Sequence, residues 1–212
     1  LSVKGAVFTN FTKFLVDEIK KTDPNCMLHP AIFEGFKSNK KQSESQLGLE
    51  VLTDTNLAVT PNFAYASISR IDGDAFLKNH ILHQEVFGPH TLLVACESLS
   101  QMKEIITNLE GQLTASLIAT EEEAQSSLEI IEALQNRVGR LVFNGVPTGV
   151  EVCNSMVHGG PYPASTDSRF SAVGVHSIKR WLRPFSFQNF PDSLLPEALK
   201  ENNPLDIKRT RI

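Results

Sequence analysis

The chain has 212 residues, of which 41% are hydrophobic and 21% are charged, and its net charge is -4. This length and composition are typical of a soluble globular protein with one large domain or two small ones. The negative net charge argues against nucleic-acid binding as the main task, and no apolar run approaches the ~20 residues that a membrane span needs.

The first part of the chain contains two helix patterns. Residues 2–8 predict a short strand, and Thr9 is suited to be the N-cap of the helix that follows. The apolar side chains of this helix are spaced to share one face: Phe8, Phe11, Leu15 and Ile19. Residues 30–43 predict a second amphipathic helix. Short strands or extended pieces are predicted at 49–52, 57–60 and 64–68.

Beyond residue 90 the pattern alternates between strands and helices. Buried strands are predicted at 91–95, 114–119 and 141–143. Ser98 with Gln101, and Thr120 with Glu123, predict capping boxes for the two intervening helices, and Gly111 is placed to end the first of them. Short connections between these elements predict parallel strands joined by right-handed crossovers. The fold class is therefore α/β, with a parallel-stranded sheet flanked by helices.

The segment Asn144–Gly174 follows the last strand and has neither helical nor strand periodicity. Loops of about 30 residues are uncommon in compact domains and are usually functional or disordered, and this one is too apolar for a disordered linker. Ligands bind outside the carboxyl ends of parallel strands, and the other two strands are followed by short turns, so we expect the pocket here. No glycine-rich phosphate fingerprint follows any of the three strands, so these units are not a dinucleotide-binding Rossmann half.

The long segment contains a histidine and a cysteine that could carry chemistry. His158 can act as a general acid or base near neutral pH, although a loop histidine that only hydrogen-bonds backbone is the favoured reading of this residue alone. Cys153 lies five residues from it in the sequence, and a cysteine hydrolase using both is a minor alternative. Cys96 ends a buried strand and Cys26 lies in an unactivated turn. The three cysteines are favoured as structural, indicate a reduced, cytoplasmic setting, and have no metal-ligand spacing.

Three motifs together indicate a family. The run Glu85–Pro89 (EVFGP) forms a rigid turn with an acidic and an aromatic side chain two residues apart, and it is weak as a signal on its own. With Leu113–Leu117 (LTASL) and Gly139–Asn144 (GRLVFN), it resembles the C-terminal, catalytic-domain portion of NAD(P)-dependent aldehyde dehydrogenases, in order and in spacing, over nearly the whole chain. The run Met156–Arg169 departs from the Pro-Phe-Gly-Gly-type loop of most members. It is similar to the subgroup of α-ketoglutarate semialdehyde (2,5-dioxovalerate) dehydrogenases and the Vibrio-type NADP-dependent fatty aldehyde dehydrogenase.

The resemblance implies roles for cofactor-binding and catalytic residues. Glu85 would hydrogen-bond the hydroxyls of the nicotinamide ribose of NAD or NADP, and Phe87 would pack near the nicotinamide ring. His158 would lie near the catalytic thiol as an auxiliary group. The implied chemistry is thiolate attack on an aldehyde, hydride transfer to NAD(P), and hydrolysis of the thioester. The nucleophilic cysteine belongs to a Gly-Gln-x-Cys-Thr-type motif expected before Leu1, so we expect the chain to be part of a longer enzyme and to be inactive alone.

Four further residues are candidates for substrate binding. The resemblance implies that Thr148, Val150 and Val152 line the aldehyde entrance. Arg169 is the only arginine of the long segment, and we hypothesise that it anchors the carboxylate of a dicarboxylate semialdehyde. The implied reaction is oxidation of 2,5-dioxovalerate to 2-oxoglutarate, with a fatty aldehyde dehydrogenase of the same mechanism, or a non-catalytic interaction fragment, as the alternatives.

The expected organisation has three parts. Residues 1–175 would form the catalytic domain, residues 176–190 a bridging and oligomerisation strand, and residues 191–212 a C-terminal extension. The family implies a homodimer or homotetramer that acts on a small-molecule aldehyde, with no nucleic-acid or membrane partner.

Overall fold

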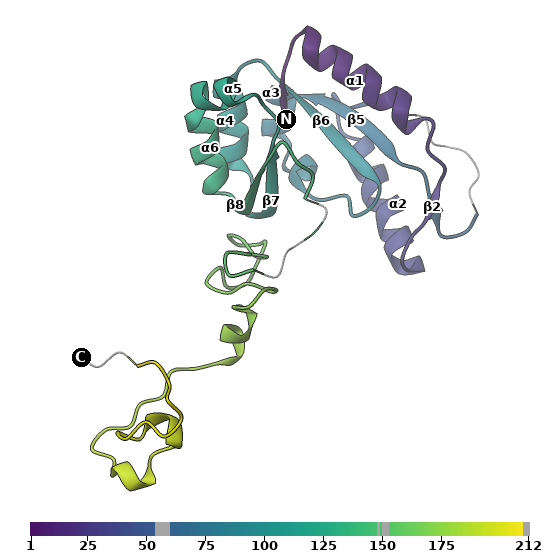
Figure 1. The fold of residues 1–212 in the computed structure, drawn as a ribbon. Helices are drawn as coiled ribbons and strands as arrows, with labels where there is room; N and C mark the ends of the chain where they lie inside the picture. Colours follow the sequence, from purple (N-terminus) through teal and green to yellow (C-terminus); the bar gives the residue numbers. More distant parts are fainter. Residues whose placement is uncertain (54–59, 148, 150–152, 210–212) are drawn as a thin grey trace. The chain divides into compact units, whose positions relative to one another are not determined.

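The structure is a computed structural model that describes residues 1–53, 60–147, 149 and 153–209. The chain divides into two compact units, Leu1–Ser177 and Ile178–Ile212. All strands among the described residues belong to the first unit (Figure 1).

The larger sheet of the first unit has four strands in the order β1-β6-β5-β3. Their bounds are Ser2–Val3 for β1, Glu50–Val51 for β3, Ser67–Asp72 for β5 and His90–Cys96 for β6. β1 and β5 run parallel to β6, and β3 runs antiparallel to β5. The sequence predicts β6, but it indicates only a short run at 64–68 where the central strand β5 forms. The small, buried Ser67 and Ser69 interrupt the apolar pattern of β5 and conceal it.

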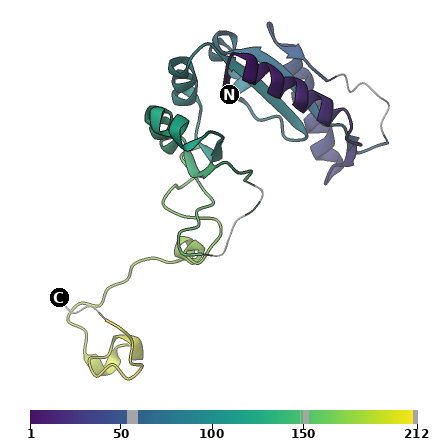
Figure 2. The ribbon, with the colours of Figure 1, turned by 45° about the horizontal axis from the view of Figure 1, so that its top comes forward.

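Helices cover both faces of this sheet. On one face, Phe8 of α1 (Ala6–Ile19) packs with Ile68, Leu93 and Ala95, and Figure 2 shows this helix lying across the strands. The other face packs against α3 (Gly73–Lys78) and α4 (Leu99–Asn108) through a second cluster. That cluster consists of Ile71, Phe76, Leu82, Val94, Cys96 and Ile105. The core therefore lies on both sides of β5 and β6, as expected for an α/β layer arrangement.

The start and the buried face of α1 differ from the prediction. The helix begins at Ala6 with Gly5 as its N-cap, and Thr9 lies inside it, where its hydroxyl donates to the Gly5 carbonyl at 3.0 Å. Thr12 takes the buried position expected for Phe11, which is 50% exposed. Apolar spacing alone could not distinguish these two faces, because Val7, Phe11 and Phe14 form an exposed stripe of their own.

A second, two-stranded sheet pairs β7 (Gln112–Leu117) in parallel with β8 (Val138–Phe143). The prediction that 91–95, 114–119 and 141–143 form one sheet is wrong, since β6 pairs with β5 and β1 instead. α4 packs on α6 (Leu128–Gln135) through Ile106, Ile130 and Ala133. The helices rather than the strands therefore connect the two sheets.

The capping signals predict two helix starts correctly. The Ser98 hydroxyl accepts from the Gln101 amide at 3.2 Å, although the Gln101 side chain accepts from Glu97 rather than from Ser98. Thr120 and Glu123 form the reciprocal box at the start of α5 (Glu121–Ser126). The helix expected after Thr120 breaks at Ser127, which separates α5 from α6.

The remaining elements are short. An antiparallel pair joins β2 (Asn25–Cys26) to β4 (Phe63–Ala64), α2 spans Pro30–Glu44, and the 3-10 helix η1 spans His80–His83. Further 3-10 helices are η2 (Ser177–Trp181), η3 (Asp192–Leu194) and η4 (Glu197–Leu199). Residues 182–190 form no strand in the single chain, and a bridging strand over 176–190 would need an edge from a second subunit. No helix among the described residues is long and apolar enough to cross a membrane.

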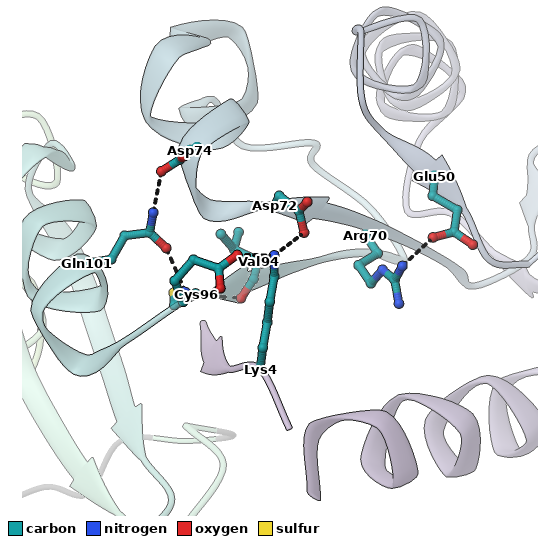
Figure 3. A network of polar contacts seen from close by, with 9 residues as sticks. Lys4, Glu50, Arg70, Asp72, Asp74, Val94, Cys96 and Gln101 are labelled. Atoms are coloured by element: carbon teal, nitrogen blue, oxygen red, sulfur yellow. Dashed lines mark hydrogen bonds and ion pairs between the residues drawn. The ribbon is translucent and has the colours of Figure 1, made fainter. Parts of the chain in front are cut away.

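Ion pairs close the carboxyl ends of β1, β5 and β6. Lys4, just after β1, binds Asp72 at the end of β5 with 3.0 Å between Nζ and Oδ1, and it also binds Glu97 (Figure 3). Hydrogen bonds from Lys4 to Glu97 and Asp72 raise the pKa of the Lys4 ammonium. Burial raises the pKa of the neighbouring Cys96 thiol, which keeps it protonated and inert. The ion pairs of Lys4 therefore link the carboxyl ends of β1, β5 and β6.

Replacing Ile105, which is fully buried, with alanine should lower the free energy of unfolding by about 2–5 kcal/mol, because lost transfer energy and a cavity add. Urea unfolding followed by circular dichroism measures this change. Val7→Ala, at an 84% exposed site on α1, is the control and should change stability by less than about 0.5 kcal/mol. Equal losses for the two variants would contradict the core described above.

Candidate functional site

The turn Glu85–Pro89 is rigid in its backbone and open at its side chains. A Cβ at Gly88 would lie 2.4 Å from the ring of Phe36 on α2, so the turn rests directly on this aromatic side chain. The Pro89 carbonyl accepts from the Ser67 amide at 2.8 Å, which ties the turn to β5. Glu85 is exposed, and Phe87 is 60% exposed. The turn thus presents an acidic and an aromatic side chain on a fixed support.

His90, the first residue of β6, is a half-buried titratable group that the sequence did not reveal. Its Nδ1 lies 2.9 Å from the Ser67 hydroxyl, and its Nε2 is buried with no partner among the described residues. Burial, with a smaller effect from the nearby Lys40 charge, lowers the pKa of His90 from 6.5 to about 4. His90 is therefore neutral at physiological pH and supports the turn next to it.

Glu85 lies in an open groove of about 690 Å³. Its walls come from three parts of the chain: His83–Glu85, Glu110–Thr114 and Pro163–Ala164. The His83 ring is fixed by stacking on Phe76 and by a 2.9 Å hydrogen bond between Nε2 and the Phe76 carbonyl. The structure thus joins two features that lie far apart in the sequence, the Glu85 turn and the end of the long segment.

At the start of the long segment, the Asn144 side chain is held by two hydrogen bonds to the backbone of Ala119. The Asn144 side chain donates to the Ala119 carbonyl at 2.8 Å and accepts from the Ala119 amide at 2.9 Å. The Arg140 guanidinium then donates to the Gly149 carbonyl at 2.7 Å. From there the chain returns to the amino-terminal ends of β7 and β8, where the Gly111 amide donates to the Tyr162 carbonyl at 3.2 Å. The segment reaches the groove at the amino-terminal ends of the two strands with Pro163 and Ala164, and the pocket predicted at the carboxyl ends stays a prediction, because residues 148 and 150–152 lie outside the described residues.

Glycines make this return possible. A Cβ at Gly139 would lie 1.9 Å from the Gly159 oxygen, and a Cβ at Gly111 would lie 2.0 Å from the Pro161 oxygen. At Gly160, a Cβ would lie 2.4 Å from the Gln112 oxygen. These are backbone contacts that cannot rotate away, so any side chain would displace the segment. Gly111 was expected to end a helix, but α4 already ends at Asn108 and the role of Gly111 is this close approach.

His158 lies half-buried just before the close contact. Its amide donates to the Ser171 hydroxyl at 3.0 Å, and its carbonyl accepts from the Ala172 amide at 2.9 Å. No described residue forms a hydrogen bond with its imidazole. The two interpretations from the sequence, a loop histidine that only hydrogen-bonds backbone and an auxiliary catalytic group, both stay predictions. The Cys153 thiol lies 3.5 Å from the Ser155 hydroxyl.

The substrate candidates are placed only in part. Arg169 is 80% exposed and forms a two-pronged pair with Asp167, with distances of 2.9 Å and 2.7 Å, and this carboxylate raises its pKa. Thr148, Val150 and Val152 lie outside the described residues. No group of three or more potential metal ligands occurs in the described part of the chain.

Known proteins similar to this chain share one kind of chemistry. No protein-family profile matches it. It is 36% identical, over 211 residues, to alpha-ketoglutaric semialdehyde dehydrogenase 2 of Azospirillum brasilense. It is 34% identical, over 210 residues, to alpha-ketoglutaric semialdehyde dehydrogenase of Acinetobacter baylyi. These matches cover 100% and 99% of this chain but 40% of each relative, so the chain spans about two fifths of their length.

Solved structures extend the similarity to the fold. A putative methylmalonate-semialdehyde dehydrogenase from Sinorhizobium meliloti 1021, complexed with NAD, matches 85% of this chain and 38% of its own, at a TM-score of 0.68 and 16% identity. A salicylaldehyde dehydrogenase from Pseudomonas putida G7, complexed with salicylaldehyde, matches 88% of this chain and 39% of its own, at a TM-score of 0.65 and 16% identity. The predicted α/β fold class is confirmed by these likenesses.

The lowered pKa of His90 predicts a pH dependence of stability. Between about pH 6.5 and pH 4, the unfolded chain binds more protons at this histidine than the folded chain does. The free energy of unfolding should therefore fall as the pH drops through this window and be independent of His90 above it. Urea unfolding at several pH values measures the slope, which should be smaller in His90→Asn. His176→Asn, at an exposed histidine, is the control, and an unchanged slope in His90→Asn would contradict the assignment.

Proposed function

We propose that the chain belongs to the aldehyde dehydrogenase superfamily and forms the C-terminal part of the catalytic domain of an NAD(P)-dependent aldehyde dehydrogenase. The observation that carries this proposal is identity of 34% and 36% to two alpha-ketoglutaric semialdehyde dehydrogenases along the whole chain. The open groove around Glu85 supports it independently, because a carboxylate on a rigid turn suits a ligand with neighbouring hydroxyl groups.

The cofactor would bind along the turn Glu85–Pro89. NAD or NADP supplies a nicotinamide ring that accepts the hydride of the aldehyde. Glu85 would accept hydrogen bonds from the ribose hydroxyls, and the exposed ring of Phe87 would pack against the nicotinamide. The fit is supported by the fixed backbone of the turn, which leaves both side chains accessible.

The proposed substrate is 2,5-dioxovalerate, oxidised to 2-oxoglutarate, after the names of the two relatives. The thiolate of a cysteine outside this chain would attack the aldehyde carbon to give a thiohemiacetal, loss of its hydride to NAD or NADP would give a thioester, and water would hydrolyse that thioester to the acid and the free thiol. His158, whose imidazole forms no hydrogen bond to another described residue, would face this chemistry as a proton acceptor. Thr148, Val150 and Val152 would line the entrance. Arg169 would bind the distal carboxylate, sharing its charge with Asp167.

The second unit suits contact with a further subunit. Its exposed apolar side chains include Trp181 (80% exposed), Leu182 (63%) and Phe185 (68%). Apolar groups gathered over a short segment mark an interaction surface more often than they mark plain solvent contact. We propose a homodimer or homotetramer in which residues 178–190 pair with a partner subunit.

The first test is turnover by the gene product that contains this chain. It should reduce NAD or NADP in the presence of 2,5-dioxovalerate and release 2-oxoglutarate. Glu85→Gln should lower kcat/KM for the cofactor about 10-fold to 100-fold, because charge-assisted hydrogen bonds contribute about 1.5–3 kcal/mol. Glu110→Gln, on another wall of the same groove, is the matched control and should change kcat/KM less than about two-fold. Equal losses in both variants would contradict the assignment of Glu85 to the ribose.

The substrate anchor is tested with Arg169→Met. This change removes the charge while keeping an apolar stem, so the KM for 2,5-dioxovalerate should rise about 10-fold. A long-chain aldehyde without a carboxylate serves as the internal control and should show an unchanged KM. An unchanged KM for both substrates removes Arg169 from the site, and turnover of the long-chain aldehyde alone redirects the proposal to fatty aldehydes.

A further inference from the structure

The backbone of His158 is held at both of its polar groups. The Ser171 hydroxyl accepts from the His158 amide at 3.0 Å, and the Ala172 amide donates to the His158 carbonyl at 2.9 Å. Ser171 is only 9% exposed, and its hydroxyl donates to the Val173 carbonyl at 2.6 Å. Because that bond uses the hydroxyl proton, the oxygen lone pairs are directed to the His158 amide. Ser171 is thus a buried acceptor for the His158 amide, and at the longer distance of 3.4 Å also for the Val173 amide.

The next residue along the chain is held by close packing. The Gly159 carbonyl oxygen lies only 1.9 Å from the position that a Cβ of Gly139 would take. Gly139 belongs to β8, which pairs with β7 along its length. The chain at His158 and Gly159 is therefore held at two neighbouring points, by Ser171 at the His158 amide and by close packing against β8 at the Gly159 carbonyl.

The imidazole takes no part in this fastening. The bonds that hold the segment involve the backbone of His158 and side chains or backbone elsewhere, and no described residue bonds to the ring. A histidine kept only for structure would use its ring nitrogens to satisfy nearby backbone groups. A fixed backbone with a free ring is instead the arrangement that places a reactive group in a set position.

We propose that Ser171 and Gly139 are positioning residues that present the His158 imidazole to the aldehyde site. This inference rests on the proposed function of His158. Ser171 acts through the hydrogen bond to the amide, and Gly139 acts by leaving room for the Gly159 carbonyl. Neither residue touches the reacting atoms.

A structural test uses the gene product that contains this chain. Hydrogen exchange of the His158 amide, measured by mass spectrometry on the peptide that contains it, should accelerate at least 10-fold in Ser171→Ala. Ser168→Ala is the matched control, since Ser168 lies exposed in the same segment, and its exchange should equal that of the wild type. If Ser171→Ala fails to fold, Gly139→Ala disturbs the same segment at the neighbouring Gly159 carbonyl. Unchanged exchange in the folded variant would overturn the proposal.

A kinetic test uses the gene product that contains the chain and a double-mutant cycle. His158→Gln and Ser171→Ala should each lower kcat by about 5-fold to 20-fold without changing the KM for the cofactor. The double variant should be no slower than His158→Gln alone, because a positioning residue has nothing left to position. If the kcat of the double variant falls by the product of the two single-variant losses, Ser171 acts independently of His158, and the proposal is overturned.

The outcomes separate this inference from the function it rests on. If the wild type oxidises no aldehyde, the proposed function is refuted, while the exchange experiment still reports whether Ser171 holds the His158 amide. Wild-type activity with an unaffected His158→Gln variant overturns both the role of His158 and its positioning. If His158→Gln lowers kcat but Ser171→Ala does not, only the positioning role of Ser171 is overturned.

Discussion

The close approach of the long segment to the amino-terminal ends of β7 and β8 is the constraint on which the candidate site depends. Gly111, Gly139 and Gly160 let main chain lie against main chain where any Cβ would collide with a carbonyl oxygen. This contact holds His158 at one point and brings Pro163 and Ala164 to the groove that contains Glu85. Without it, the two candidate functional regions would have no fixed relation to each other.

Polar clusters elsewhere in the chain have a different purpose. The carboxyl ends of β1, β5 and β6, where parallel sheets often bind ligands, hold Lys4 between Asp72 and Glu97 (Figure 3). Lys4, Asp72 and Glu97 each take part in an ion pair, so these charges link the strands at this end of the sheet. The candidate site residues are the reverse case, because Glu85 in the groove is exposed and the imidazole of His158, which does not line the groove, has no bond to another described residue. Unused hydrogen-bonding capacity on a fixed backbone therefore distinguishes the site from the scaffold.

The sequence predicted local features well and long-range pairing poorly. Hydroxyl N-caps at Ser98 and Thr120 are local interactions, so their residues alone located two helices. Strand pairing is a long-range feature: β6 and β7 lie in different sheets, and β5 is a central strand. The apolar runs predict where strands form but not which strands pair with each other. His90 escaped notice because its lowered pKa comes from burial in the fold and, to a smaller extent, from the charge of Lys40, which lies 50 residues away in the sequence. The three motifs located Glu85 in advance, but its groove could not be foreseen, since one wall arrives about 80 residues later in the chain.

The central claim is that the turn Glu85–Pro89 and His158, with its backbone held by Ser171, form one side of a nicotinamide-dependent aldehyde site. The most direct test is a crystal structure of the gene product that contains this chain, with NAD or NADP bound. The account predicts the Glu85 carboxylate at about 2.7 Å from the ribose hydroxyls and the His158 ring facing the nucleophilic thiol. A cofactor bound away from Glu85, or a His158 ring directed to bulk solvent, would contradict it.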